Sequence, residues 1–268
     1  MRKDFLVLSL VLLAGCKSVS TTQPGAVGVE RKQNMLVSSA TVNRGAENAY
    51  RQVLSEASGK GQLNRDAAQL ARIRRIAGRL IPQTGAFRAD APGWKWEVNL
   101  ISSKEVNAWC MPGGKIAFYT GLIERLQPSD DEIAAVMGHE IGHALREHGR
   151  ERASQAMAQG IGIAVVGAAL GMSGGAQDLT QTVLDLTFNL PNSRTDEIEA
   201  DRVGVELAAR GGFNPHAAVT LWEKMGKAGG SQPPQFLSTH PSHATRIADL
   251  RGYSERVMPL YAAARAKP

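Results

Sequence analysis

The stretch that decides this chain is His139-Glu140-Ile141-Gly142-His143, which lies near the middle of 268 residues. On a helix, side chains four positions apart lie one above the other, so the two imidazoles can converge on a single metal ion. The glutamate between them lies beside that ion, where it can take a proton from a water molecule. This pattern is typical of a zinc-dependent peptide-bond hydrolase, and a chain of this length contains it by chance about 1% of the time.

The residues around the pattern favour a helix with one buried face. Ser129 is suited to cap its first turn, Glu132 can complete a capping box, and the acidic first turn complements the positive end of the helix dipole. Apolar residues recur at helical spacing at Ile133, Val136, Met137, Ile141, Ala144 and Leu145. The alternative interpretation is that the two histidines merely cap or pair on a buried helix.

A third protein ligand is expected, because two histidines hold zinc poorly and the fourth position is left for water. The residues directly after the motif do not supply it. Arg146 and Gly149 stand where an extended three-histidine motif requires a glycine and a histidine, and His148 is out of register by one residue. The better candidate is Glu197, on a second helix that we predict to end at Gly211-Gly212.

Asp201 lies one helical turn after Glu197 and on the same helix face. An aspartate there can accept a hydrogen bond from a ligating histidine and so fix its tautomer. Glu199, two positions from Glu197, is expected to point away from that face. The alternative for this acidic cluster is a solvated helix surface, but opposite a helix that lacks a third ligand we favour metal binding.

These residues resemble the gluzincin family of zinc metallopeptidases that contains HtpX and the CAAX prenyl peptidases, and in particular its periplasmic lipoprotein branch, with BepA and LoiP. The resemblance runs from about Leu63 to Leu250 and rests on four groups of residues. They are Asn107-Ala108 with Pro112-Gly113-Gly114 and Gly121; His139 to His143; Ser193-Arg194 with Glu197 and Ala200-Asp201; and Thr239-His240-Pro241 with Arg246.

The resemblance implies an endopeptidase with one Zn²⁺ per chain, ligated by His139, His143 and Glu197. Glu140 is then the general base that takes a proton from the attacking water and later delivers it to the leaving amine. Asp201 would orient a ligating histidine.

The resemblance also places His240 and Arg246 near the active site. Either side chain could donate a hydrogen bond to the oxyanion that forms during peptide hydrolysis. In such enzymes a histidine at this place can also act as a latch that occupies the open metal position. The alternatives are that His240 is a loop histidine without a role and that Arg246 is an ordinary surface charge.

Three short segments are predicted strands: residues 94–100, 106–111 and 115–119, with Pro112-Gly113-Gly114 as a turn between the last two. An edge strand beside a metal-containing cleft can bind an extended peptide through main-chain hydrogen bonds. We therefore expect Asn107 and Ala108 to bind substrate, and we expect unfolded proteins as substrates, because such binding uses mainly the backbone. The alternative is that these strands serve packing alone.

The amino terminus predicts an address in the bacterial envelope. Arg2-Lys3 precedes an apolar run over residues 5–14, the pattern of a signal peptide that is too short for a permanent membrane span. Residues 13–16, Leu-Ala-Gly-Cys, resemble a lipoprotein processing site, so we predict a signal peptide over residues 1–15 and lipidation of Cys16. Lys17 replaces the aspartate that retains lipoproteins at the inner membrane. We therefore expect a lipid anchor in the outer membrane, on its periplasmic side; the alternative is an ordinary secreted protein.

The rest of the chain is predicted to form one domain. Residues 16–40 are rich in Ser, Thr, Gly and Gln, and we expect the lipidated cysteine to be followed by a flexible tether over this range. Residues 41–268 are expected to be the zinc metallopeptidase domain, an α+β fold that is mostly helical, with a small β-sheet next to the motif helix. The apolar, glycine-rich segment 160–175 is interpreted as a lid or a core element; a membrane-touching element is the alternative.

The expected function is quality control, in which the enzyme cleaves unfolded or misassembled envelope proteins. Two other interpretations stay open: an outer-membrane assembly or chaperone factor in which client binding dominates over cleavage, and a zinc hydrolase of cell-wall peptides. The presence of Glu140 favours cleavage over pure binding. The formal net charge of +6 suits a protein near anionic lipids, and since the chain carries no nucleic-acid motif, we expect no nucleic-acid partner. Lipidation of Cys16 would leave Cys110 unpaired, as a buried residue.

Overall fold

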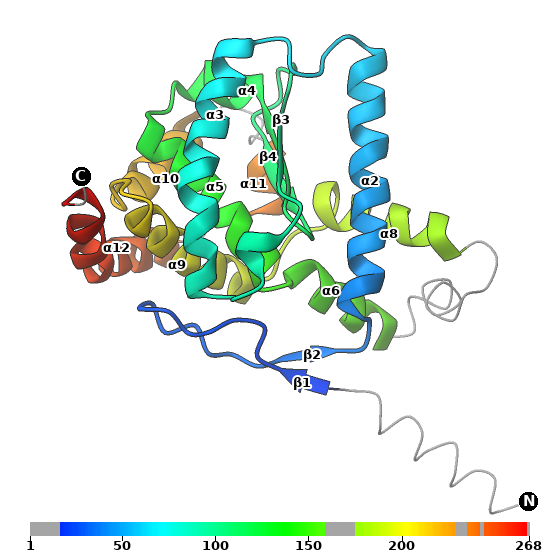
Figure 1. Cartoon of the computed structure of the whole chain (residues 1–268), viewed down its shortest axis with the longest axis horizontal. Coiled ribbons are helices and arrows are strands. Elements are labelled where there is room, and N and C mark those ends of the chain that lie inside the picture. Colours follow the sequence, from blue (N-terminus) through cyan, green and yellow to red (C-terminus); the bar gives the residue numbers. More distant parts are fainter. Residues whose placement is uncertain (1–16, 159–174, 229–234, 242–243, 267–268) are drawn as a thin grey trace, which may run out of the picture.

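The computed structural model describes residues 17–158, 175–228, 235–241 and 244–266 (Figure 1). In chain order, its elements are β1 (Lys17–Val19), β2 (Gln33–Met35), α2 (Ser39–Gly59), α3 (Ala67–Leu80), η1 (Ile81–Ala86), η2 (Ala91–Gly93), β3 (Glu97–Ile101), β4 (Ala108–Met111), β5 (Lys115–Tyr119), α4 (Thr120–Leu126), α5 (Asp130–Leu145), α6 (His148–Ala158), α8 (Gly175–Phe188), α9 (Arg194–Arg210), α10 (Ala217–Ala228), α11 (Gln235–Thr239) and α12 (Ala244–Arg265). The predicted fold class, α+β and mostly helical, is confirmed.

A three-stranded mixed sheet lies between two layers of helices (Figure 1). Its strand order is β3-β5-β4, with β3 parallel and β4 antiparallel to β5. Every residue of β5 is buried, because both faces of the sheet are covered. Ile116 and Phe118 belong to the larger core with α3 and α5, whereas Ala117 and Tyr119 belong to a second core with α2 and α8. The predicted strands over 106–111 and 115–119 are thus present, and the one predicted over 94–100 begins at Glu97.

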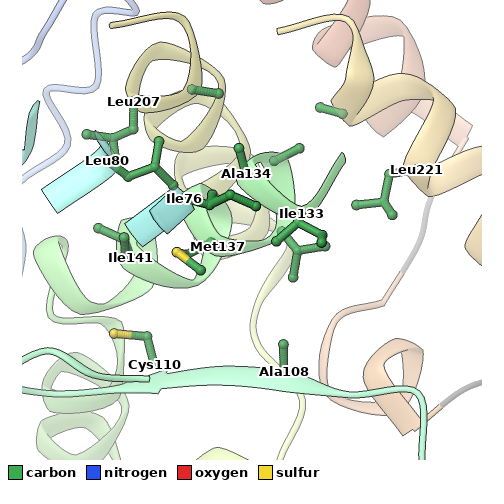
Figure 2. Close-up of a cluster of buried hydrophobic side chains, with 14 of the residues drawn as sticks. Ile76, Leu80, Ala108, Cys110, Ile133, Ala134, Met137, Ile141, Leu207 and Leu221 are labelled. Atoms are coloured by element: carbon green, nitrogen blue, oxygen red, sulfur yellow. The ribbon is translucent and has the colours of Figure 1, made fainter. Parts of the chain in front are cut away.

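Helix α5, which carries the histidine motif, lies in the middle of the larger core (Figure 2). Its residues Ile133, Met137 and Ile141 have no exposed surface. The side chains around them come from four neighbouring elements: Ile76 and Leu80 of α3, Leu207 of α9, Leu221 of α10, and Ala108 and Cys110 of β4. Burial of one such aliphatic side chain is worth about 1.5–3 kcal/mol, so this helix is firmly held on its apolar side.

The two ends of α5 are also fixed. The predicted capping box is present, with Ser129 Oγ accepting from the Glu132 backbone N–H and the Glu132 carboxylate accepting from the Ser129 N–H. At the other end, Arg146 caps the helix and Glu147 takes a left-handed conformation with φ of 53°. The chain therefore turns sharply into α6 directly after the motif.

The amino-terminal segment differs from the prediction. Residues 16–40 were expected to form a flexible tether, but their described part is built into the domain. β1 and β2 pair antiparallel and run along the lower side of the molecule in Figure 1. Between them, Val27 and Val29 are buried in the larger core. We call residues 17–37 the N-terminal strap.

A tight turn in the middle of the strap, between β1 and β2, accounts for Gly25 and Gly28, which both have positive φ. Gly25 has a φ of 62°, and a Cβ atom there would lie 2.6 Å from both Glu206 Oε2 and the Phe87 ring. The Gln23 backbone N–H donates to the Phe87 carbonyl, and the Val29 N–H donates to the Pro24 carbonyl. Small and polar residues that are typical of a linker thus form an ordered, hydrogen-bonded segment.

Three sequence predictions fall on other parts of the chain. The signal peptide over residues 1–15 and Cys16 lie outside the described residues, and so does segment 160–175 up to residue 174. Among the helices that the structure does describe, none combines the length and hydropathy needed to cross a membrane.

Candidate active site

Helices α5 and α9 cross at a distance that only glycines permit. A Cβ atom on Gly138 would lie 2.8 Å from the Gly204 carbonyl oxygen, and one on Gly142 would lie 2.9 Å from the Ala200 oxygen. Both obstacles are backbone atoms, which cannot move aside. Small residues four apart on each helix therefore form the crossing. The sequence contains this signal at Gly138 and Gly142 and again at Ala200 and Gly204, although we did not predict the contact from it.

The crossing brings the expected ligands together. His139, His143, Glu197 and His240 are all buried, and each offers one ligand atom within 4.8 Å of the others. His143 Nε2 lies 3.1 Å from His139 Nε2 and 3.3 Å from Glu197 Oε1. The structure thus joins the three predicted ligands and adds His240 to them.

These four residues fit a zinc ion. Among the residues that the structure describes, neither carboxylate oxygen of Glu197 has a hydrogen-bond partner, although the side chain is fully buried. Its ion-pair partner Arg246 lies on one side, with Nη1 2.7 Å from Oε2. Arg246 does not pair with Oε1, and a buried carboxylate oxygen without a hydrogen bond is costly unless a cation completes its surroundings. Two imidazoles and one carboxylate are a donor set of catalytic zinc sites.

Asp201 lies behind His139, as its position on α9 predicted. Its Oδ1 is 2.9 Å from His139 Nδ1 and 2.8 Å from Arg246 Nη2. Burial alone would raise the pKa of Asp201, but the charge of Arg246 and the hydrogen bond from His139 lower it to about 2. The aspartate therefore stays ionised, and it holds the His139 ring with Nε2 directed at the other ligand atoms.

Arg246 is an internal residue and not a surface charge. It is 1% exposed, it forms ion pairs with both Glu197 and Asp201, and its guanidinium lies 3.5 Å from the centre of the Trp222 ring. Because its donors face these two carboxylates, the geometry favours charge compensation of the ligand set over hydrogen bonding to a substrate.

Glu140 lies beside the ligand group on the same helix. Burial and repulsion from Glu197 raise the pKa of the Glu140 carboxyl well above its usual range, while the backbone N–H of Cys110 and the charge of Arg246 lower it. Its Oε1 is buried and has no hydrogen-bond partner among the described residues. A carboxylate with a raised pKa is a stronger base than one in water, which suits a residue that must accept a proton.

His240 lies at the end of α11 with its ring stacked on Phe236, 4.2 Å between centroids. Its Nδ1 lies 3.1 Å from the Phe236 carbonyl oxygen and 3.0 Å from Thr239 Oγ1. A proton on Nδ1 leaves the Nε2 lone pair free, and Nε2 lies 3.4 Å from Glu140 Oε1. Burial lowers the pKa of His240 well below its usual value, so the ring is neutral.

The far side of His143 contacts residues that we did not predict to be part of the site. His143 Nδ1 lies 2.8 Å from His148 Nδ1, and His148 Nε2 lies 3.1 Å from Glu199 Oε2. Glu199 points away from Glu197, as expected, but it is buried and not solvated. Burial raises the pKa of Glu199, but hydrogen bonds from His148 and Arg31 outweigh this effect and lower it to about 2. No local pattern in the sequence marks these partners.

A small cavity of about 60 Å³ opens onto the site between β4, α5 and α8. Its lining includes Glu140, His143 and His240, together with Trp109 and Met111 of β4. β4 is an edge strand of the sheet, as predicted.

The two residues expected to bind substrate, Asn107 and Ala108, do not line this cavity. The Asn107 carbonyl accepts from the Tyr119 N–H, and the Ala108 side chain points toward α5 (Figure 2). Residues 109–111 of the same strand are therefore better placed than these two to meet a substrate.

A helix with two histidines and a glutamate, crossed by a helix that places a buried glutamate beside them, fits a zinc metallopeptidase in which that glutamate would be the third ligand. Comparison with known proteins agrees, since the model of peptidase family M48 matches residues 67–254. The chain belongs to this family. The resemblance noted in the sequence is confirmed at this level.

Curated relatives include two kinds of protein. The "Mitochondrial metalloendopeptidase OMA1" of Arabidopsis thaliana is 40% identical over 161 residues, 60% of this chain and 32% of that protein. Its namesake in Schizosaccharomyces pombe is 34% identical over 206 residues, 76% of this chain and 58% of that protein. The "Beta-barrel assembly-enhancing protease" of Escherichia coli K12 is 32% identical over 171 residues, 60% of this chain and 35% of that protein. The chain thus spans between 32% and 58% of the length of these relatives.

Proposed function

We propose that this chain is a zinc-dependent endopeptidase that cleaves unfolded or misassembled proteins of the bacterial envelope. The observation that carries the proposal is the position of Glu140, which is buried with an unpartnered oxygen beside a converging set of ligand atoms. A pure binding protein does not need a base at this place. The relatives support the proposal, because both printed names denote proteases.

The residues have separate roles in the proposed reaction. His139, His143 and Glu197 would hold one Zn²⁺, which when bound polarises the scissile carbonyl and acidifies a water molecule. Glu140 accepts a proton from that water and passes it to the leaving amine.

Three further residues support this chemistry. Asp201 orients His139, and Arg246 compensates the charge of Glu197 and Asp201. His240 faces the same space through Nε2, where it can donate to the oxyanion when protonated there or act as a latch by taking a ligand position.

The substrate would bind along β4. Its outer edge pairs with no other strand among the described residues, and it can add an extended peptide by main-chain hydrogen bonds, which read backbone more than side chains. The cavity of about 60 Å³ beside it has room for only a few water molecules. We infer that α8, whose residues Val183, Leu186 and Thr187 line the cavity, moves aside when a peptide enters.

The proposed location is the periplasmic side of the outer membrane, with an anchor on Cys16. The sequence of residues 1–16 supports this proposal, and so does the printed name of the Escherichia coli relative, which refers to β-barrel assembly. A second candidate function, client binding without cleavage in envelope assembly, is favoured by the same free strand edge. Retention of Glu140 argues against it.

The deciding experiment compares the purified full chain with a Glu140→Gln variant. Zinc content is measured in both, and cleavage of an unfolded protein such as casein is then followed. Zinc in both with cleavage only by the parent supports the endopeptidase. Zinc in both with no cleavage by either leaves a latched site or a binding role, and His240→Ala separates these because it frees the fourth position. A parent that binds no zinc contradicts the proposal.

A further inference from the structure

The metal ligand His143 has an unusual partner on its outer side. The Nε2 atom of His143 faces the other ligand atoms, so the orientation of the ring depends on the hydrogen bond that Nδ1 makes on the opposite side. A ligating histidine normally donates that second N–H to a carboxylate, a carbonyl or water. Here the partner is another imidazole, His148, with 2.8 Å between the two Nδ1 atoms.

Metal binding determines the direction of each hydrogen bond in this chain of contacts. His143 must keep the Nε2 lone pair free, so the proton lies on Nδ1 and is donated to His148 Nδ1. His148 then carries its own proton on Nε2 and donates it to Glu199 Oε2 at 3.1 Å. The orientation of His143 is therefore set by His148, and that of His148 is set by Glu199.

Two arginines from distant parts of the sequence fix the Glu199 carboxylate. Arg146, fully buried at the end of α5, places Nε 2.9 Å from Oε2. Arg31, from the N-terminal strap, places Nε 2.7 Å from Oε1. Arg31 also holds Glu151 of α6 at 2.6 Å and Asp196 of α9 at 3.3 Å. It is thus a cationic partner shared by three buried carboxylates, and of these Glu199 is also paired with Arg146.

The strap holds Arg31 between fixed points. On one side, the Val27 backbone N–H donates to Glu206 Oε2 at 3.0 Å. On the other, Gln33 Nε2 donates to the Arg146 carbonyl at 2.8 Å, and the Leu36 N–H donates to Ser154 Oγ at 3.0 Å. The Arg31 carbonyl itself accepts from Arg146 Nη2 at 2.8 Å. The backbone on both sides of Arg31 is therefore fixed by hydrogen bonds to the domain, and these hold its side chain beside Glu199.

We propose that the N-terminal strap is a positioning element of the metal site, in which Arg31 fixes Glu199 and, through His148, the ring of the ligand His143. The inference rests on the proposed function only in taking His143 as a metal ligand. Because Arg31 belongs to this strap, release of the strap from the domain would weaken zinc binding as well.

Zinc affinity of the full chain, measured by competition with a chromophoric chelator, tests the proposal. The variants are Arg31→Gln, Arg31→Lys, His148→Phe, which keeps a ring but removes the acceptor, and the double variant of Arg31→Gln with His148→Phe. The control is Arg202→Gln, which removes an ion pair with Asp249 of α12; Arg202 acts on Glu199 only through its charge and makes no hydrogen bond to it. Loss of such outer partners weakens metal binding roughly 10- to 100-fold, and we expect this range for Arg31→Gln.

The double variant separates positioning from a general effect on the fold. If Arg31 acts through His148, the Arg31→Gln change weakens zinc binding in the parent but not in the His148→Phe background. Arg31→Lys keeps the charge but loses the forked contacts, so its affinity should lie between those of the parent and Arg31→Gln. Parent-like affinity of Arg31→Gln, or equal losses in both backgrounds, would overturn the proposal.

Two checks keep the result interpretable. Thermal unfolding of the metal-free variants shows whether they fold; if Arg31→Gln does not, the same cycle is carried out with Arg31→Lys and decides in the same way. Absence of zinc binding by the parent would contradict the proposed function itself. That result differs from parent-like binding by Arg31→Gln, which would contradict only the role of the strap.

Discussion

The crossed helices α5 and α9 and the N-terminal strap hold the same metal site by opposite means. The helices carry ligands at regular spacing, with apolar side chains and glycines that set their distance. The strap has little regular structure, and it is held by hydrogen bonds and ion pairs to residues more than 100 positions away. The first region can be recognised from spacing alone, because helical geometry decides which side chains share a face. The second depends on partners that only the folded chain brings near.

The largest effect is expected at the helix crossing. A Cβ atom on Gly204 would lie 2.7 Å from the His139 backbone nitrogen, so Gly204→Val must push α9 away from α5. We expect a loss of more than about 4 kcal/mol in the free energy of unfolding, enough to prevent stable folding, as judged by circular dichroism and urea titration. The control is Gly226→Ala in α10, where a Cβ meets nothing within 4 Å. There we expect a gain of roughly 0.5–1 kcal/mol. Equal behaviour of the two variants would show that close approach does not hold the ligand helices.

The next effect concerns the ion pair behind His139. Asp201→Asn removes the charge that faces Arg246 inside the protein, which leaves the guanidinium with Glu197 as its remaining charged partner. Breaking a buried pair from one side costs about 3–5 kcal/mol, and we expect a stability loss near the lower figure because asparagine still accepts hydrogen bonds. Urea unfolding of the metal-free protein measures it. A loss below about 1 kcal/mol would mean that the pair is solvated, contrary to its burial.

Acid should weaken the contact between the strap and the helices. The pKa of Glu199 is lowered from 4.5 to about 2, so its stabilising contribution is complete above pH 4.5 and disappears as the pH falls toward 2. A shift of this size corresponds to about 3 kcal/mol. The free energy of unfolding of Glu199→Gln should therefore fall less than that of the parent between pH 5 and 2, when both are measured by urea titration at each pH. If the free energy of unfolding falls equally with pH in the two proteins, His148 and Arg31 do not stabilise the ionised Glu199.

These two regions also show how far the sequence could predict the site. Helical spacing, together with the need for a third ligand, singled out His139, Glu140, His143, Glu197 and Asp201, and the structure brings all five together. The mostly helical α+β fold followed from periodicity in the same way. Turn and linker chemistry was less informative, since the glycines and small polar residues of the strap are those of a flexible tether.

The residues that sequence analysis missed lack a local signal. His148 and Glu199 contact each other although they are 51 positions apart, and Arg31 is 168 positions from Glu199. A hydrogen bond over such distances depends on where the whole chain places two side chains, and no periodicity reports it. The glycine pairs at the helix crossing are different, because small residues four apart on two helices can be recognised as a close contact in advance.

The smallest effect is expected for Arg202→Gln, and its difference from Arg31→Gln tests whether the strap contact is buried. Arg202 and Arg31 are similarly exposed, at 28% and 33%, so exposure alone predicts the same minor loss for both. Their partners differ, because Asp249 is 26% exposed whereas the three carboxylates around Arg31 are 5–8% exposed. Arg202→Gln should therefore cost less than about 1 kcal/mol in urea unfolding, as exposed ion pairs do. Arg31→Gln should cost more than twice as much, because it leaves buried carboxylates uncompensated. Similar losses for both arginines would mean that water reaches the strap contact and that the strap is only a surface feature.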